Sequence, residues 1–319
     1  MTLPACGSSN GSPTAAGGAA GSVSAGTGGD SSVGGAGGGS QLVGSFQLKL
    51  VAATDQGDAT TNLLGKVYDG PTPVTTIWER PQVDGPCTLT TPRVPFCNVA
   101  CGGSSACVED DVCLPYPTAH GVGTVTVSGV NTVDGTSSFT MTPIANNYQP
   151  SVGLSYPPFA EGDPVTVAAA GDFFPKFSLN SSGIAPLELT STELTLKDGQ
   201  ELGLTWTKSA AGKSTVHVKL DISHHGGSRG QIECDADDSG SLKISAPLVS
   251  KLLALGVAGY PTVIVTRRSI GSTTISAGRV ELVVSSVVER SIAIDGLSSC
   301  TKTKDCPADK TCQSDLTCK

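Results

Sequence analysis

The sequence predicts an all-β protein: two antiparallel β-sandwich-like units with small disulfide-rich modules, one short helix and a disordered Gly/Ser-rich N-terminus. Three observations carry this prediction. After residue 44, apolar residues alternate with polar ones along most of the chain, as in strands with one buried face. Glycine and proline occur 40 and 20 times and mark frequent turns. Aromatic residues make up only 4% of the chain, so we expect cores of valine, leucine and isoleucine.

Residues 1–44 are expected to be a lipobox-like start followed by a flexible linker. From Gly7 to Gly44 the chain consists mainly of Gly, Ser, Ala and Thr, with Asp30 as its only charge. This composition cannot bury enough apolar surface to offset the entropy of folding. We therefore expect a flexible coil with a mean span of about 35 Å.

Residues 45–155 are expected to form the first sandwich-like unit, with a cysteine-rich insertion at 97–113. Phe46, Leu48 and Leu50 share one face of its first strand. Further strands are expected at 74–78, 87–89, 125–127 and 139–141. The last two are joined through a turn at Asp134-Gly135.

Residues 156–297 are expected to form the second sandwich-like unit. Leu196 precedes Asp198-Gly199 and Leu202 follows it, which is the pattern of a two-residue hairpin. Other strands with alternating apolar residues are expected at 216–222, 232–234, 242–244, 263–265, 280–284 and 292–294. The charged pair Arg267-Arg268 is interpreted as flanking a turn.

One short helix is expected at 246–255. Ser245 can cap its N-terminus, and Pro247 suits its first turn. Apolar residues at 248, 249, 252, 253 and 255 repeat with helical spacing, and Gly256 can end the helix. We expect this helix to close one end of the second unit.

Eight of the eleven cysteines fall into two tracts. The tracts contain Cys97, Cys101, Cys107 and Cys113, and Cys300, Cys306, Cys312 and Cys318, and each includes the spacing C-x5-C-x5-C. A segment of about 20 residues has no hydrophobic core, so cross-links must order it. We expect two bridges in each tract, at 97–113 and 298–319, and three connectivities are open in each. Such cysteine density is typical of oxidising compartments.

Two resemblances refine this interpretation. Leu3-Pro4-Ala5-Cys6 resembles the lipobox of bacterial lipoproteins, whose cysteine is acylated and becomes the mature N-terminus. The two tracts, with Asp305-Cys306-Pro307 as the most typical fragment, resemble short modules of uncharacterised bacterial surface lipoproteins and are loosely similar to EGF-like modules. The resemblances imply lipidation at Cys6, a signal peptide upstream of Met1, and an extracytoplasmic place on the outer membrane or cell surface. A chance match at residues 3–6 is the alternative.

With Cys6 set aside, elimination pairs the two remaining cysteines. Cys87 and Cys234 lie in phase with the apolar residues Leu89 and Ile232, so both should point inward. A bridge between them would join the two expected units and close a loop of about 147 residues. In the chain-entropy model, that closure stabilises the fold by about 5 kcal/mol.

Asp235-Ala-Asp237-Asp-Ser239-Gly240 resembles the first half of a calcium loop, with oxygen ligands at alternate positions and a glycine at the turn. No cofactor is expected, and a structural calcium ion held by Asp235, Asp237 and Ser239 is the alternative that this motif raises. Ala246 stands where the bidentate carboxylate is expected, so a β-turn led by Asp and closed by Gly is the simpler interpretation.

The remaining motifs do not indicate catalysis. A G-x-S-x-G pattern spans 226–230 after His224-His225, but a strand follows it in place of the helix that a nucleophile elbow requires, so we expect a hairpin loop. The acidic run 109–111 is expected to be a solvated tip. Trp78 and Trp206 are expected in the core, and an exposed Trp78 would indicate stacking on carbohydrate.

Charge and hydropathy limit the function. The chain has 28 acidic and 20 basic residues and no basic stripe, which argues against a nucleic-acid partner. It has no apolar run of about 18 residues, so any membrane attachment is expected through the lipid at Cys6. We expect a non-enzymatic, surface-anchored lipoprotein that serves as an adhesion, binding or structural module toward an extracellular protein or polysaccharide. The alternatives are a secreted carbohydrate-active or hydrolytic protein and a calcium-stabilised surface domain.

Overall fold

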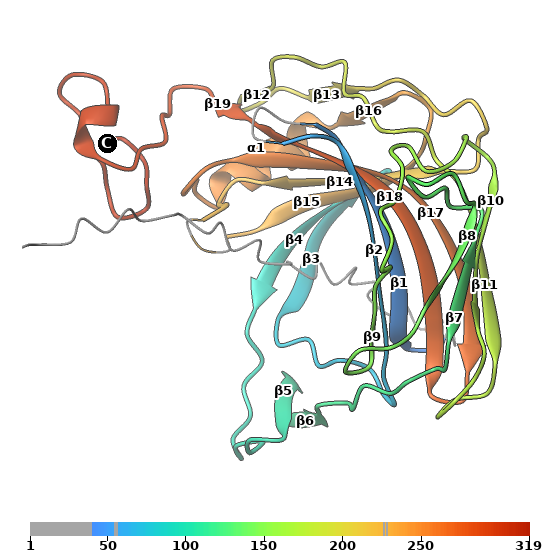
Figure 1. Cartoon of the computed structure of the whole chain (residues 1–319). Helices are drawn as coiled ribbons and strands as arrows, with labels where there is room; N and C mark the ends of the chain where they lie inside the picture. The colour runs from blue at the N-terminus through green and yellow to red at the C-terminus, as the bar shows by residue number, and fades with distance from the viewer. Residues whose placement is uncertain (1–39, 54–56, 226, 228) are drawn as a thin grey trace, which may run out of the picture. The chain divides into compact units, whose positions relative to one another are not determined.

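The computed structural model describes residues 40–53, 57–225, 227 and 229–319 (Figure 1). From Ser40 onward the chain is one compact unit, composed mostly of strands with one α-helix, so the expected all-β class is confirmed. Cys6 and linker residues 7–39 lie outside the described residues. No helix in the described ranges is long and apolar enough to cross a membrane.

A nine-stranded sheet organises this unit, in the order β3-β4-β15-β14-β17-β18-β1-β2-β9. Its strands are β1 (Leu42–Val51), β2 (Thr60–Val67), β3 (Ile77–Asp84), β4 (Cys87–Arg93), β9 (Asn147–Tyr148), β14 (Thr215–Asp221), β15 (Gln231–Asp237), β17 (Thr262–Ile275) and β18 (Gly278–Ser291). Neighbouring strands are antiparallel, except that β1 lies parallel to β18. The expectation of purely antiparallel pairing is therefore corrected at β1, which inserts beside a strand from the other end of the chain.

Smaller sheets surround this large one. A four-stranded sheet has the order β11-β10-β7-β8, and three two-stranded sheets pair β12 with β19, β13 with β16 and β5 with β6. The bounds are β5 (Ser105–Glu109), β6 (Val112–Pro115), β7 (Val125–Ser128), β8 (Ser138–Met141), β10 (Pro164–Ala169), β11 (Phe177–Ser182), β12 (Thr195–Leu196), β13 (Leu202–Thr205), β16 (Ser241–Ile244), β19 (Ala293–Ile294), α1 (Ala246–Ala254) and the 3-10 helix η1 (Thr303–Asp305).

Two hydrophobic clusters lie on one face of the nine-stranded sheet. The first, here called the helix-side cluster, joins buried residues of β14, β15 and β17 to those of α1, β13 and β16. The second, the sandwich cluster, joins β1, β2 and β18 to β7, β10 and β11 of the four-stranded sheet. Between them Arg267, Ser269 and Ser286 are buried on the same face, so a polar seam separates the two cores.

Strand pairing crosses the boundary expected between residues 155 and 156. β4 pairs with β15, β1 pairs with β18, and β7 pairs with β10, each joining a strand from 45–155 to one from 156–297. The two sandwich-like packings thus share one large sheet. Alternation of apolar residues shows which face of a strand is buried, but it does not show which strand lies beside it.

The turn at Asp198-Gly199 forms, and Gly199 has a φ of 73° that suits glycine. The hairpin expected around this turn does not form, because β12 pairs in parallel with β19 and β13 pairs with β16. Distant segments therefore complete each short strand. By contrast, the hairpin expected around Asp134-Gly135 is present as β7 and β8.

The expected helix is present as α1, which buries Leu248, Val249 and Leu252 against the helix-side cluster. Pro247 lies in its first turn, and Gly256 follows its end with a φ of 90°. Ser245 occupies the N-cap position but makes no capping hydrogen bond through its side chain. The expected side-chain cap at Ser245 is therefore absent. The helix is stabilised by the burial of its three apolar side chains.

The four-stranded sheet comes closest to the nine-stranded sheet where β11 crosses β17. A Cβ atom added to Gly271 would lie 1.7 Å from the carbonyl oxygen of Asn180. Beside this contact, Ser181 Oγ donates to the carbonyl oxygen of Ser269 at 3.0 Å. Only glycine permits this approach, which places the covering sheet over the sandwich cluster.

Candidate binding surface

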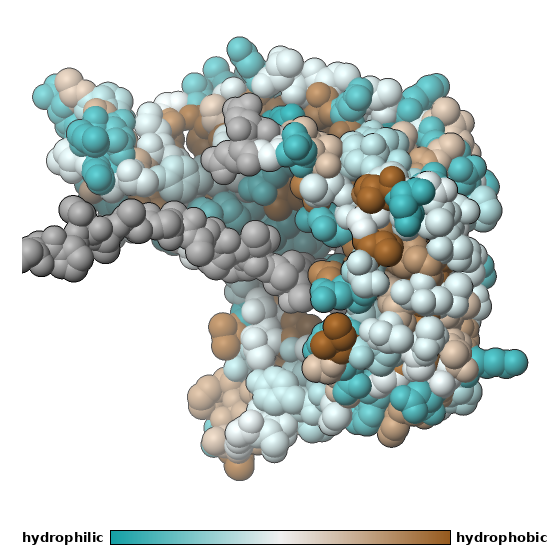
Figure 2. All heavy atoms as spheres, in the orientation of Figure 1, coloured by the Kyte–Doolittle hydropathy of each residue, from teal (hydrophilic) through white to brown (hydrophobic). Residues whose placement is uncertain are grey.

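The side of the nine-stranded sheet opposite both clusters carries no packed layer in the part of the chain that the structure describes (Figure 1). We call this side the open face. Residues that alternate with the buried ones lie on it, among them His217, Lys219, Glu233, Asp235 and Arg268. Figure 2 shows a hollow lined largely by hydrophilic residues on this side of the molecule.

A cluster of three charged or ionisable side chains lies on the open face. Asp235 of β15 is directly opposite His217 of β14, and its Oδ1 lies 3.0 Å from His217 Nδ1. Arg268 Nη2 on β17 donates to the same oxygen at 2.6 Å. The side chains of His217 and Arg268 are 17% and 15% exposed, whereas that of Asp235 is 66% exposed. Two mostly buried groups thus hold a carboxylate toward solvent.

The surroundings of Asp235 keep it ionised. The hydrogen bond with His217 is the largest cause that lowers its pKa, and Arg268 lowers the pKa further through charge and a hydrogen bond, against the opposing effect of burial. An ionised acceptor fixed beside an imidazole and a guanidinium can orient hydroxyl or amide groups of a ligand. The arrangement therefore suits binding.

The two tryptophans have different environments. Trp206 is buried in the helix-side cluster, as expected, and its Nε1 donates to Asp238 Oδ1 at 2.7 Å. Trp78 is only partly buried, on the edge strand β3, so it is not a core residue. It lies opposite Pro92 of β4, beyond a register shift between Glu79 and Gln82. Pro92 alternates with the core-facing Leu89 and Cys87 along β4, in phase with Thr88, so this pair belongs to the open face.

The three residues predicted to hold calcium lie at the end of β15 and in the following turn. Asp235 is already bound to His217 and Arg268, and Ser239 Oγ donates to the carbonyl oxygen of Ser241 at 3.1 Å. Asp237 is exposed. Calcium binding at these residues stays a prediction, and any ion would compete with the guanidinium of Arg268 and the ring of His217 for Asp235.

The G-x-S-x-G pattern lies in the loop that joins β14 to β15, with residues 226 and 228 outside the described residues. β15 follows this loop as a strand, which confirms the expected hairpin. The rings of His224 and His225 lie with their centroids 4.0 Å apart within it. Neither the described residues of the loop nor the strand after it supply the helix that a nucleophile elbow requires.

All ten cysteines in the described ranges are bridged. Cys87 pairs with Cys234, the pair that elimination predicted, between neighbouring strands β4 and β15. Cys97 pairs with Cys107 and Cys101 with Cys113, while Cys300 pairs with Cys312 and Cys306 with Cys318. In both tracts the first cysteine bonds the third and the second bonds the fourth, which selects one of the connectivities that the sequence left open.

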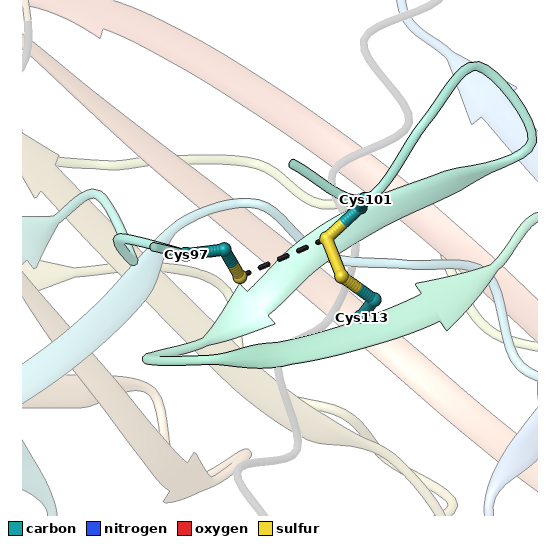
Figure 3. A group of neighbouring side chains, drawn as sticks. All are labelled: Cys97, Cys101 and Cys113. Atoms are coloured by element: carbon teal, nitrogen blue, oxygen red, sulfur yellow. Dashed lines mark hydrogen bonds between the residues drawn. A yellow bond between two sulfur atoms is a disulfide. The ribbon is translucent and has the colours of Figure 1, made fainter. Parts of the chain in front are cut away.

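The bridges bring the sulfur atoms of Cys97, Cys101 and Cys113 within 4.8 Å of one another (Figure 3). Cys300, Cys306 and Cys318 form a similar group. A metal binds cysteine as the thiolate, and these sulfur atoms are in disulfides. The proximity is therefore a result of cross-linking.

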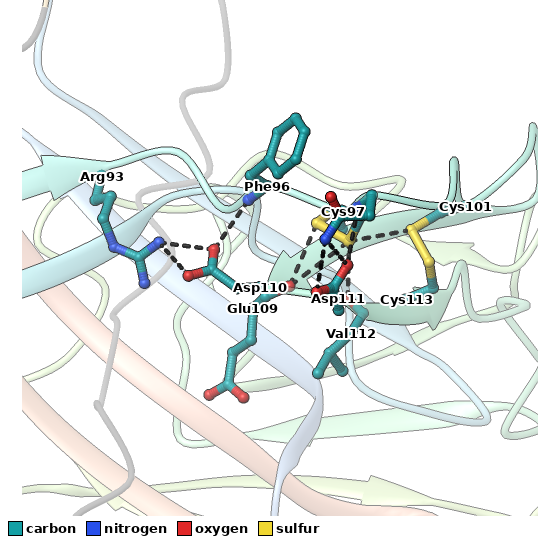
Figure 4. The surroundings of a disulfide bond; sticks show 11 residues. Arg93, Phe96, Cys97, Cys101, Glu109, Asp110, Asp111, Val112 and Cys113 are labelled. Atoms are coloured by element: carbon teal, nitrogen blue, oxygen red, sulfur yellow. Dashed lines mark hydrogen bonds and ion pairs between the residues drawn. A yellow bond between two sulfur atoms is a disulfide. The ribbon is translucent and has the colours of Figure 1, made fainter.

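The acidic run 109–111 braces the first tract, although its residues are exposed (Figure 4). Arg93 Nη1 donates to both oxygens of Asp110 at 2.8 and 3.0 Å, and the Phe96 backbone N–H donates to Asp110 Oδ1 at 3.0 Å. Asp111 accepts from the Asn98 backbone N–H at 2.8 Å. Two of the three acids expected to be a solvated tip thus order the preceding segment.

Sequence reasoning missed a buried ion pair between Arg267 and Asp238. Arg267 lies within β17, in phase with the buried Val263 and Val265, so its interpretation as turn-flanking charge is wrong. An arginine at a core-facing position of an alternating strand was the available signal. Its partner Asp238 lies inside the calcium-like motif but turns toward the polar seam.

A cleft of about 560 Å³ was also missed, because its walls come from separate parts of the chain. Leu194, Pro261, Ile292, Ile294 and Leu297 give it an apolar lining, next to Tyr260, Glu193 and several hydroxyl groups. It borders the start of the C-terminal cysteine tract at Ser299, whose Oγ donates to the carbonyl oxygen of Gly259 at 2.6 Å.

Comparison with known proteins adds no assignment. No protein-family model matches the chain, and no curated protein matches it at a significant level.

Proposed function

We propose that this chain is a non-enzymatic surface lipoprotein, attached to a membrane through a lipid at Cys6, that binds an extracellular protein or polysaccharide with its open face. The observation that carries the extracytoplasmic part is the complete pairing of the ten cysteines among the described residues. Disulfides on this scale form and persist where the surroundings are oxidising.

A binding role is favoured by the chemistry of the open face. Its ionisable groups pair with one another, as Asp235 does with Arg268 through an ion pair and with His217 through a hydrogen bond. The face extends across neighbouring strands, which suits an extended partner. Polar groups distributed over a broad sheet give many contacts, whereas catalysis needs a few groups converging on one reacting atom.

A secreted carbohydrate-active protein is the second candidate. Trp78 favours it, because a partly exposed indole at a sheet edge can stack on a sugar ring. Glu233 and Asp235 lie two positions apart on β15 and so share the open face. Glu233 Oε1 accepts a hydrogen bond from Gln231 Nε2 at 2.6 Å, which is compatible with a sugar-binding carboxylate.

Anchoring is tested by expressing the gene with its genomic upstream region in a bacterium supplied with labelled palmitate. We expect the label on the N-terminal peptide and no free thiol among the other ten cysteines in a non-reducing peptide map. Cys6→Ser should remove the label and release the protein from membranes, while the bridges persist. An unlabelled wild-type protein with reduced cysteines would refute the proposal.

Binding is tested with a panel of purified bacterial polysaccharides and extracellular matrix proteins immobilised on a sensor surface. We expect one class to bind wild type and to lose at least about tenfold in affinity with Arg268→Ala or Lys219→Ala. The matched control is Lys243→Ala on β16, which removes an exposed ion pair with Glu201. Release of new reducing ends from a polysaccharide would instead assign the carbohydrate-active alternative.

A further inference from the structure

The two disulfides of the first cysteine tract lie close enough for their sulfur atoms to exchange partners. The sulfur atoms of Cys97 and Cys101 belong to different bridges, and they lie 3.7 Å apart (Figure 3). Thiol–disulfide exchange requires a thiolate to reach a disulfide sulfur, so its rate depends on such proximity and on access from solvent. A thiolate formed at Cys101 would therefore have the neighbouring bridge at Cys97 within reach.

The other two cysteines of the tract are positioned to form a bridge of their own. Cys107 of β5 lies directly opposite Cys113 of β6. Opposed residues of antiparallel strands have Cα atoms about 4.5–5.5 Å apart, within the range that a disulfide spans. The chain already contains such a bridge, because Cys87 and Cys234 are directly opposite on β4 and β15. A second pairing of the tract, first cysteine with second and third with fourth, is therefore compatible with the hairpin of β5 and β6.

The bridge between Cys101 and Cys113 is open to an external thiol, because Cys113 is exposed. The corresponding bridge of the C-terminal cysteine tract joins Cys306 to Cys318, and Cys318 is only 3% exposed. The first cysteine of that tract, Cys300, is 2% exposed. The two tracts thus share one bridge pattern, but the first presents its fourth cysteine to solvent and the C-terminal tract buries it.

We propose that the bridge between Cys101 and Cys113 is a thiol-exchange site, at which a small external thiol converts the first tract to the second pairing. The external thiolate attacks Cys113 Sγ, which forms a mixed disulfide there and releases the Cys101 thiolate. Cys101 Sγ attacks Cys97 Sγ, which forms a bridge between them and releases the Cys107 thiolate. Cys107 Sγ then attacks Cys113 Sγ, which closes their bridge and expels the external thiolate. Each step breaks one S–S bond and forms one, so the thiol acts as a catalyst and no oxidant or reductant is consumed.

The exchange would separate the segment before β5 from the hairpin that now holds it. In the present pairing, both bridges join residues 97–101 to β5 or β6. In the second pairing, one bridge lies within 97–101 and the other within the hairpin, so neither links the two parts. The segment would then depend on hydrogen bonds from the Phe96 and Asn98 backbone N–H groups to Asp110 and Asp111. The exchange therefore converts a cross-linked segment into one that can detach.

The test uses the full chain with Cys6→Ser in every sample, so that the exchange cannot start from that thiol. Mercaptoethanol is added in substoichiometric amount at mildly alkaline pH, acid stops the reaction, and the chain is cleaved between Cys101 and Cys107. The two fragments stay linked in the present pairing and separate in the second. We expect separate fragments, with no lasting thiol adduct, to form at least about tenfold faster than any change of pairing in the C-terminal tract.

A variant tests the central step without an external thiol. Cys113→Ser leaves a thiol at Cys101, whose sulfur lies 3.7 Å from Cys97 Sγ in the parent structure. We expect alkylation to find the free thiol mainly at Cys107, with a bridge between Cys97 and Cys101. The matched control is Cys97→Ser with Cys107→Ser, which removes the bridge that Cys101 would attack. In this control, mercaptoethanol should remain attached at Cys113 and Cys101 should be alkylated.

Hydrogen–deuterium exchange tests the separation of the segment. We expect the amide protons of Phe96 and Asn98 to exchange at least about tenfold faster in the second pairing than in the first. Ile232, which pairs with Leu89 between β15 and β4, is the internal control and should keep its protection. Unchanged protection at Phe96 would show that the hydrogen bonds alone hold the segment, which would overturn its release.

Three outcomes would overturn the exchange site itself. Fragments that stay linked at every thiol concentration would show that Cys113 is not attacked or that Cys101 does not reach Cys97. A lasting adduct on the chain with all four cysteines of the tract would show that the second step fails. Equal rates in the two tracts would show that the exposure of Cys113 does not control the reaction.

Discussion

Arg267 and Asp238 form an ion pair with both side chains removed from solvent, at 1% and 2% exposure, in the polar seam between the two hydrophobic clusters. Arg267 Nε donates to Asp238 Oδ2 at 2.6 Å, and its other nitrogens donate to the carbonyl oxygens of Ala185, Pro186 and Thr207. Asp238 also accepts from Trp206 and Ser214. The pair therefore ties together β17, the turn after β15 and the segments that connect the two cores.

Removing one partner of this pair should destabilise the protein strongly. Asp238→Ala leaves the guanidinium of Arg267 buried without its counter-charge, so we expect a loss of about 3–5 kcal/mol in the free energy of unfolding. Urea unfolding followed by tryptophan fluorescence measures it. Lys243→Ala, at an exposed pair, should cost less than about 1 kcal/mol. Equal losses in the two variants would contradict a special role for the seam.

Loss of the bridge between Cys87 and Cys234 should also destabilise the fold. The bridge closes a loop with a sequence separation of 147 residues, and the chain-entropy model gives a stabilisation of about 5 kcal/mol. Replacing both cysteines with alanine should lower the urea midpoint accordingly, while the ends of the chain keep their own bridges. A free thiol at Cys234 in wild type, or an unchanged midpoint in the double variant, would refute this.

Gly271→Ala should destabilise the contact between β11 and β17. The added Cβ would meet the Asn180 carbonyl oxygen at 1.7 Å, so the covering sheet must shift, at about 1–3 kcal/mol or more. Gly203→Ala is the matched control, because no atom lies within 4 Å of a Cβ at that strand position. Thermal unfolding of both variants measures the difference. Similar midpoints would show that β11 can move away freely.

Acid should weaken the C-terminal tract through Asp315. The hydrogen bond with Lys319, and then that with Thr317, lower the pKa of Asp315 to about 2 from its usual 3.8. Because the folded pKa is depressed, this contribution is complete well above pH 3.8 and is lost as the pH falls toward 2. Carbon-detected NMR titration should show the low pKa, and Lys319→Ala should raise it. A wild-type pKa near 3.8 would contradict the pairing.

Calcium provides a separate test of the motif at 235–239. If Asp235, Asp237 and Ser239 bind the ion, millimolar calcium should raise the melting temperature, and Asp237→Asn should abolish the increase. Arg268→Ala should strengthen binding, because it removes a cation that competes for Asp235. Magnesium at the same concentration is the control. An unchanged melting temperature would exclude the site.

Local patterns in the sequence predicted the elements better than their arrangement. The strand of Phe46, the helix ending before Gly256 and the inward orientation of Cys87 and Cys234 follow from residues close together in the chain. The pairing of β12 with β19, and of β1 with β18, depends on segments far apart, for which alternation gives no information.

The candidate binding surface shows the same difference. The residues next to Asp235 in the sequence predict a calcium ligand, but its partners His217 and Arg268 come from two other strands and hold its carboxylate themselves. The calcium-like motif selects alternate positions and therefore omits Asp238. Its burial depends on the segments around Trp206 and Ser214, which only the folded chain brings together.

The position of the bridge between β4 and β15 has a mechanical consequence. The segment at 93–116 continues from the end of β4, so tension applied there would separate β4 from β15 starting at Thr90 and Gln231. The last pair to be reached is Cys87 with Cys234, which is covalent. Under load, β4 can therefore separate from β15 only as far as this disulfide. Beyond that point the hairpin of β3 and β4 stays covalently attached to the sheet.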